Sequence, residues 1–305
     1  MFETQRIIPA TRLERTPNFD MRFPPLPKTV TEVSALIAQK KDVPDTPGLV
    51  RIVNADPVIA GSVLRRINSA YYGVRRRVGD LQKAVFLLGF DEVCDLVMTS
   101  GMMKLGDVLN SDEQAAIFEQ IMKMSVGTAA YARKIASHLK LYQHNAAFTL
   151  GLLHTVGRLV LLYNRPDDYE ALWCTNDYGF APTVTSEQII FGTDHAEMGA
   201  LAADSWHLPD FVVQIVRHYL TPGHLEDHEL RVQALTLSVA ATATERLCIH
   251  ERSQQPNFEP TAALYTLART LQLKPTEIVE VIEASWKEVY DYTRSMVDEK
   301  ALGGP

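Results

Sequence analysis

The sequence predicts an all-α protein, built as a multi-helix bundle. Apolar residues recur at three- and four-residue spacing along most of the chain, whereas few segments alternate with period two and none of these is long. Capping residues, glycines and prolines separate the apolar stretches as helix starts and stops. The 305 residues are 46% hydrophobic and 22% charged, which is typical of a globular chain with a sizeable core and not of a disordered one.

The predicted helices can be placed in chain order from their apolar rows and their start signals. Residues 1–22 lack helical periodicity and are expected to form an N-terminal arm, and residues 49–53 are an apolar segment to which no helix is assigned. Helices are predicted at about residues 30–37, 57–67, 81–88, 91–103, 112–135, 145–163, 166–178, 183–191, 196–206, 209–218 and 230–248, with two more around 264–271 and 278–282.

The boundaries of these helices have specific chemical causes. Asp and Ser side chains accept hydrogen bonds from free N–H groups at a helix start, and a glutamine or glutamate three residues later completes a capping box. Proline is tolerated in the first turn but stops a helix further along, and glycine suits the C-terminal end. The start signals are Asp56-Pro57, Asp80, Ser111 with Gln114, and Asp194 with Glu197; the stop signals are Gly89 and Pro166.

The net charge and the cysteine content argue against several kinds of partner and site. The formal net charge of −7 argues against non-specific binding to nucleic acid or to an anionic membrane. The three cysteines, Cys94, Cys174 and Cys248, are widely spaced and form neither a disulfide framework nor a CxxC metal clip. No N-terminal signal core and no run of about 18 apolar residues is found. We therefore expect a cytoplasmic protein with no membrane association and no specific nucleic-acid partner.

Several short motifs, taken in their order and spacing, resemble the HDOD domain family over roughly residues 23–222. They are Leu26-Pro27, Asn54-Ala55-Asp56-Pro57, Asn68-Ser69-Ala70-Tyr71-Tyr72-Gly73, Leu81-Gln82-Lys83-Ala84-Val85 with Leu88-Gly89, Gly151-Leu152-Leu153-His154-Thr155-Val156-Gly157, and Asp194-His195-Ala196-Glu197 with Gly199, Trp206 and Leu208-Pro209.

This resemblance implies an α-helical bundle related to HD phosphohydrolases and to HD-GYP cyclic-di-GMP phosphodiesterases. Members of the family are bacterial and are regarded as signalling or regulatory modules that lack the metal ligands of the hydrolases. The resemblance also suggests a division into an N-terminal arm at 1–22, the HDOD domain at 23–225, and C-terminal helices at 226–305 that pack on the same body.

An HD hydrolase brings histidines and aspartates from several helices to one or two metal ions, which activate water. Aligned with that pattern, the chain keeps three imidazoles and loses every carboxylate. The matched positions are Met124, His154, Thr155, His195, His218 followed by Tyr219, and Val239 to Thr242. A thioether and a hydroxyl are poor replacements for the missing ligands, so we expect no metal and no cofactor.

The histidines nevertheless stay weak metal candidates, because three imidazoles alone can bind zinc. The alternative for His154 is a core histidine that donates to a carbonyl of a neighbouring helix. His195 follows a capping aspartate and can simply belong to a helix N-terminus, and His218 lies near a helix C-terminus, which suits a cation. Met124 lies on an apolar row and is expected in the core.

An arginine-rich stretch is the best candidate for binding an anion, because guanidinium groups match phosphate geometry. The alternative is a solvated surface for the arginines. The nearby polar residues could line a cleft or could satisfy backbone groups where a helix ends. The candidates are Arg65, Arg66, Arg75, Arg76 and Arg77, together with Asn68 and Tyr72.

The sequence is compatible with three functions, which it supports unequally. We expect a non-catalytic bacterial signal-transduction module that acts through signalling proteins or a bound nucleotide second messenger. The alternative is a metal-dependent phosphohydrolase of cyclic dinucleotides or nucleotides, against which Met124 and Thr155 argue. A nucleic-acid-binding module is disfavoured by the net charge and by the lack of a recognisable reading helix. The oligomeric state and the identity of the partner are left open.

Overall fold

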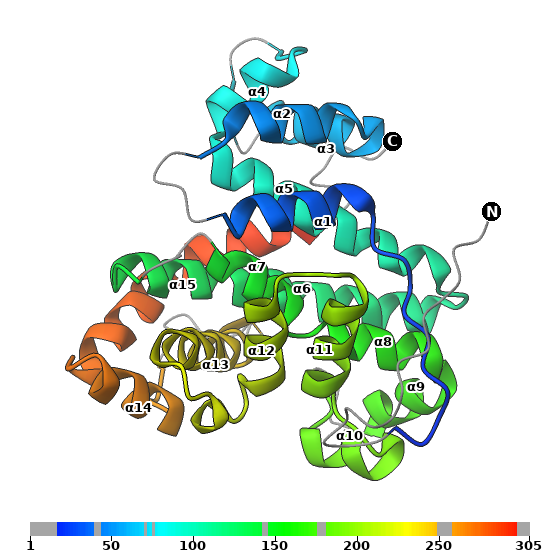
Figure 1. The fold of residues 1–305 in the computed structure, drawn as a ribbon, viewed down its shortest axis with the longest axis vertical. Coiled ribbons are helices and arrows are strands. Elements are labelled where there is room, and N and C mark those ends of the chain that lie inside the picture. Colours follow the sequence, from blue (N-terminus) through cyan, green and yellow to red (C-terminus); the bar gives the residue numbers. More distant parts are fainter. Residues whose placement is uncertain are drawn as a thin grey trace.

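The computed structural model confirms the all-α prediction (Figure 1). It describes residues 17–39, 44–69, 72–74, 77–141, 146–175, 181–248 and 258–297, and every regular element within these ranges is helical. In chain order the elements are α1 (Lys28–Ile37), α2 (Thr46–Asn54), α3 (Pro57–Ile67), α4 (Leu81–Leu88), α5 (Phe90–Met103), η2 (Lys104–Val108), α6 (Asp112–His138), α7 (Ala146–Leu153), α8 (Val156–Asn164), α9 (Pro166–Thr175), α10 (Val184–Phe191), α11 (His195–Ser205), α12 (Asp210–His218), η3 (Pro222–His224), α13 (His228–Cys248), α14 (Ala262–Thr270) and α15 (Pro275–Val297).

Helices α1 to α5 form an N-terminal lobe at one end of the molecule (Figure 1). Within it α1 packs on α2 and α5, and α3 packs on α4 and α5. Fully buried apolar side chains such as Val33, Leu49, Ile59 and Val97 fill the space between these helices. The lobe meets the rest of the protein chiefly where α5 packs on α7.

Helices α6 to α15 form the main body, with the long helix α6 at its centre. Helices α7, α13 and α15 pack directly on α6, and α11 packs on both α8 and α12. Residues from the C-terminal part of the chain therefore belong to the same body as the predicted family region. The domain boundary at residue 225 itself stays a prediction.

Part of the predicted N-terminal arm is described, namely residues 17–22, and it lies against the main body. The backbone N–H of Asn18 donates to the carbonyl of Phe191 at 3.0 Å, and that of Arg22 donates to Oδ1 of Asn164 at 2.8 Å. Residues 1–16 lie outside the described residues.

The sequence prediction missed α2. Residues 49–53, to which no helix was assigned, belong to a helix that begins at Thr46. The side chain of Asp45 caps it by accepting from the N–H of Gly48 at 2.9 Å. Pro47 lies in the first turn, where its missing N–H and fixed φ do no harm.

The predicted helix at 145–163 is divided in the structure. Helix α7 ends at Leu153 and α8 begins at Val156, with His154 and Thr155 in a turn between them. The N–H of Arg158 donates to the carbonyl of Thr155 at 2.9 Å, which closes a tight turn at the start of α8. The prediction of one uninterrupted helix was wrong at these two residues. Residue 145 lies outside the described residues.

Residues 146–164 also contain a window with a mean hydropathy of 1.5, which by length and composition alone is apolar enough to cross a membrane. The sequence prediction did not single out this window, because His154, Thr155 and Arg158 interrupt its apolar residues. Within the protein, 89% of this window is buried by other parts of the chain. The segment is accordingly placed as a core element of the bundle.

Two glycines allow the helices around this segment to approach closely. A Cβ atom added to Gly157 would lie 1.9 Å from the carbonyl oxygen of His195 and 2.6 Å from the backbone nitrogen of Gly199. One added to Gly151 would lie 2.3 Å from Cα of Ala129. Because these neighbours are backbone atoms, they cannot move aside as a side chain could. The spacing of α8 from α11, and of α7 from α6, therefore requires glycine.

Replacing Gly157 with alanine should separate α8 from α11. We expect Gly157→Ala to lower the free energy of unfolding by about 3 kcal/mol, the upper end of the usual cost of overpacking. Urea denaturation followed by circular dichroism measures this. Gly79→Ala is the control, because no atom lies within 4 Å of the added methyl group. Equal stabilities of the two variants would contradict the close approach of the helices.

Candidate functional site

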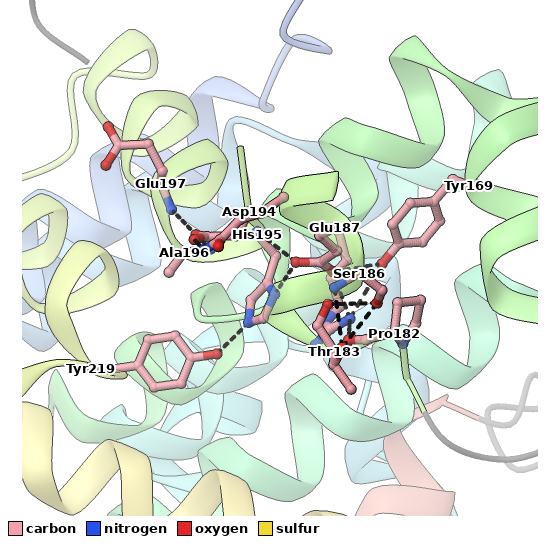
Figure 2. A network of polar contacts seen from close by, with 12 residues as sticks. Tyr169, Pro182, Thr183, Ser186, Glu187, Asp194, His195, Ala196, Glu197 and Tyr219 are labelled. Atoms are coloured by element: carbon pink, nitrogen blue, oxygen red, sulfur yellow. Dashed lines mark hydrogen bonds and ion pairs between the residues drawn. The ribbon is translucent and has the colours of Figure 1, made fainter. Parts of the chain in front are cut away.

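The region that the sequence singled out contains a network of buried polar side chains (Figure 2). Its members are Arg158 of α8, Glu187 of α10, His195 at the start of α11, and Tyr219, which follows α12. Nη1 of Arg158 donates to Oε1 of Glu187 at 2.8 Å. The other carboxylate oxygen, Oε2, accepts from Nδ1 of His195 at 2.6 Å and from its backbone N–H at 2.9 Å. Nε2 of His195 lies 2.6 Å from the hydroxyl of Tyr219.

Local capping places these side chains. Thr183 caps α10 by accepting from the N–H of Ser186, and Asp194 caps α11 by accepting from the N–H groups of Ala196 and Glu197. His195 is therefore the first residue of α11, as the helix N-terminus interpretation proposed. The carboxylate of Glu187 lies beside the same N-terminus, where the helix dipole favours negative charge.

The network carries one fixed pair of opposite charges. Burial by itself would raise the pKa of the Glu187 carboxyl, but Arg158 and His195 outweigh this effect and hold it below its ordinary value. Burial raises the pKa of the Tyr169 and Tyr219 hydroxyls well above their usual range, so both stay neutral. Nδ1 of His195 must carry a proton, because the carboxylate only accepts; in the neutral ring Nε2 then accepts from Tyr219.

His154 is a neutral histidine of the protein core. Its Nδ1 donates at 2.6 Å to the carbonyl of Gly151 in α7, the helix that His154 directly follows, and not across to a neighbouring helix as the sequence interpretation had it. Burial lowers the pKa of His154 to about 3. The next residue, Thr155, forms a short hydroxyl–hydroxyl hydrogen bond with Ser125 of α6. Met124, which precedes Ser125 in the sequence, is buried.

Of the three candidate metal-binding histidines, His154 and His195 contact the same tyrosine ring, whereas His218 has another neighbour. The rings of His154 and His195 both contact the ring of Tyr219, with centroid distances of 5.4 and 6.1 Å. His218 instead contacts the ring of His224, at 5.8 Å. In the part of the chain that the structure describes, no three His, Cys, Asp or Glu side chains are grouped as ligands for a metal ion.

These residues do not fit the divalent metal that an HD site holds. Both ring nitrogens of His195 are already hydrogen bonded, as is Nδ1 of His154. The hydroxyl of Thr155 is bonded to another hydroxyl and supplies no carboxylate. The one carboxylate in the network is bonded to the guanidinium of Arg158, whose positive charge disfavours a cation nearby.

The predicted anion-binding residues that the structure describes have different surroundings. Arg66 and Tyr72 contact each other, with the guanidinium carbon 5.4 Å from the ring centroid. Arg65 and Arg77 are exposed, and Arg65 donates to Oγ of Ser62 at 2.9 Å. Arg66 is only 1% exposed, so the surface interpretation was wrong for it. Neighbouring helix positions point about 100° apart, so that one arginine faces solvent while the next faces the interior. Arg75 and Arg76 lie outside the described residues.

The two polar candidates have structural partners. Nδ2 of Asn68 donates to the carbonyls of Leu64 and Val78 at 2.7 and 2.8 Å, and Oδ1 accepts from the N–H of Val78 at 2.7 Å. The alternative that this residue satisfies backbone groups at a helix end is thus confirmed. The hydroxyl of Tyr72 donates to the carboxylate of Glu92.

Sequence reasoning missed Arg158 and Glu187, which hold the network together. One signal was available: Arg158 lies inside the strongly apolar run 151–162. A charged residue in such a setting is buried only when it is paired. No local signal identified Glu187 as its partner, because the two residues lie 29 positions apart, on the separate helices α8 and α10.

The low pKa of His154 predicts a pH dependence of stability. The unfolded chain binds a proton at His154 near pH 6.5, whereas the folded protein binds it only near pH 3, so stability falls as the pH falls through that window. Between pH 7 and pH 5 the wild type should lose about 2 kcal/mol more than His154→Gln. Urea denaturation of both proteins at each pH measures the difference. Parallel losses would show that this imidazole is accessible to protons in the folded state.

Comparison with known proteins places this fold among solved structures. A Geobacter sulfurreducens HDOD domain protein of unknown function is 20% identical, with a TM-score of 0.69 over 90% of this chain and 93% of that one. A Shewanella amazonensis protein, provisionally named a phosphohydrolase, is 23% identical, with a TM-score of 0.64 over 92% and 95%. A Marinobacter aquaeolei protein, provisionally named a signal-transduction protein, is 22% identical, with a TM-score of 0.66 over 92% of this chain and 60% of that one.

Sequence comparison gives the family. An uncharacterized protein of Treponema pallidum (strain Nichols) is 25% identical over 210 residues, which are 68% of this chain and 39% of that protein, so the chain spans about two fifths of the length of this relative. The profile of the HDOD domain family matches residues 23–222, about two thirds of the chain and the same region that carries the motif resemblance. The chain therefore belongs to the HDOD domain family.

Proposed function

We propose that this protein is a regulatory signal-transduction module that performs no metal-dependent hydrolysis and acts through a protein partner or a bound nucleotide. The observation that carries the proposal is the hydrogen-bond network around Glu187. It occupies the ring nitrogens of His195 and pairs the carboxylate of Glu187 with Arg158. An HD hydrolase would need those groups free to bind a metal and to activate water.

Two further observations support a regulatory role. One of the structural neighbours is provisionally named a signal-transduction protein. The N-terminal lobe also carries exposed apolar side chains on α4, where Phe86 is 85% and Leu87 is 48% exposed. Large apolar side chains left in solvent are features of surfaces that bind other proteins. The rival proposal, a phosphohydrolase, is supported by the provisional name of another neighbour.

Measurements of metal content and of hydrolysis distinguish a regulatory module from a phosphohydrolase. Protein purified without chelator or His-tag should contain less than about a tenth of an equivalent of metal, with no difference between the wild type and His154→Ala. Supplying Mn²⁺, Fe²⁺ or Zn²⁺ should produce no cleavage of cyclic dinucleotides. Thr155→Asp should also stay inactive, because one restored carboxylate does not supply the other missing ligands.

The hydrolase proposal would gain from the opposite pattern. About one equivalent of metal in the wild type, lost in His154→Ala and accompanied by turnover, would overturn the regulatory proposal. Hydrolysis by Thr155→Asp alone would show that the other ligands are present after all.

A further inference from the structure

A second polar cluster lies between the N-terminal lobe and the C-terminal end of α15, away from the histidine network. We call its five charged or hydroxyl-bearing residues the lobe latch: Arg66 of α3, Glu92 and Asp95 of α5, Arg133 of α6, and Tyr292 of α15. All five side chains are buried or half-buried. Three come from the lobe and two from the main body, so the cluster crosses the boundary between them.

The lobe latch contacts α15 at two residues, Tyr292 and Ser295. Nη1 of Arg66 donates to the backbone carbonyl of Ser295 at 2.9 Å, and Nη2 lies 3.5 Å from Oε1 of Glu92. The hydroxyl of Tyr292 lies 3.4 Å from Oε2 of Glu92 and 3.4 Å from Oδ2 of Asp95.

Two guanidinium groups complete the cluster. Arg133 forms an ion pair with Asp95. The guanidinium carbons of Arg66 and Arg133 each lie 5.6 Å from the centroid of the Tyr292 ring, within the range of cation–π attraction. The last turns of α15 are thus held by charged side chains of α3, α5 and α6.

The lobe latch is balanced in charge and does not suit an anionic ligand. Two arginines face two carboxylates, and burial raises the pKa of the Tyr292 hydroxyl above its usual range, which keeps it neutral. A phosphate that approached Arg66 would meet Glu92 as well. This arrangement suits a contact between two parts of the chain.

Among the described helices, the packing of the lobe on the body is concentrated on one pair. Helices α1 to α4 pack mainly on one another and on α5, and α5 makes the principal helix-to-helix contact with the body through α7. Helix α15 packs on α6 and lies beyond residues 23–222, the region that the family profile covers. The lobe latch is therefore a direct link between the family-matched lobe and the C-terminal helix.

We propose that the lobe latch is a conformational device that opens to release the N-terminal lobe from α15. Buried charges cost free energy of desolvation, which is returned when the contact opens and water enters. Opening a polar contact of this kind therefore costs less than separating an apolar surface of similar size. The lobe can change its position relative to α15 while the apolar contacts among α1 to α5 are kept.

The lobe latch also touches the helix that leads to the histidine network. The ring of Phe148 in α7 lies 4.9 Å from the guanidinium carbon of Arg133 and 6.2 Å from the ring of Tyr292. His154 directly follows the end of α7. One short helix thus connects the two polar clusters. The proposed opening does not depend on whether the network binds a ligand.

Hydrogen–deuterium exchange on the full-length chain tests the opening. Arg66→Met replaces the guanidinium with an uncharged side chain of similar length. Because one partner of a buried ion pair is lost, amide exchange should be at least about tenfold faster in α3 and in the last turns of α15. Exchange in α8 and α11 should stay within about twofold of the wild type, since these helices keep their own contacts.

A milder variant and a matched control complete the experiment. Tyr292→Phe keeps the ring and removes the hydroxyl, and should speed exchange about fivefold in the same two segments, as expected for one lost hydrogen bond. If Arg66→Met fails to fold, Tyr292→Phe by itself still tests the proposal. The control is Glu288→Gln, which removes an exposed ion pair with Lys134 between α15 and α6 and should leave exchange unchanged.

The pattern of exchange decides the outcome. Faster exchange confined to α3 and α15 together supports the lobe latch. Faster exchange spread equally over all helices would show that the cluster only stabilises the whole fold. A change in α3 without one in α15 would show that the two are not held together, and either result would overturn the proposal.

Discussion

The buried ion pair between Arg158 and Glu187 is the interaction on which the arrangement of the histidine network depends. Both side chains are almost completely removed from water, which costs several kcal/mol for each charge unless it is paired and hydrogen bonded. Arg158 also donates to the carbonyl of Pro182, and Glu187 accepts from the ring and backbone of His195. One carboxylate therefore fixes α8, α10 and the start of α11 relative to one another.

The same pair sets the electrostatics of the network, because the positive charge beside the Glu187 carboxylate is a guanidinium. In a metal site a cation would be the positive charge that organises carboxylates and imidazoles. Here a guanidinium takes that electrostatic role, and the imidazole of His195 bridges from the carboxylate to Tyr219. His154 is a neutral core residue that donates to a carbonyl of α7, the helix it follows.

Packing and polar contacts divide their roles in this fold. Apolar helix faces and glycine contacts such as that of Gly157 set the distances within the main body. The lobe latch, in contrast, holds the lobe to α15 largely through charges, aromatic rings and one backbone carbonyl. Apolar packing is rigid because close-packed atoms allow little movement. The polar groups of the lobe latch can instead exchange their partners for water.

The sequence by itself determined the helical class, most helix positions and the family region, because caps, apolar spacing and short motifs act over a few residues. It failed at α2, a short helix with a proline in its first turn, and at the turn after Leu153. Only the tertiary structure decided that Arg66 faces inward while Arg65 faces solvent, and that Glu187 is the partner of Arg158. Pairing across a loop depends on how whole helices pack, and no local pattern of residues encodes it.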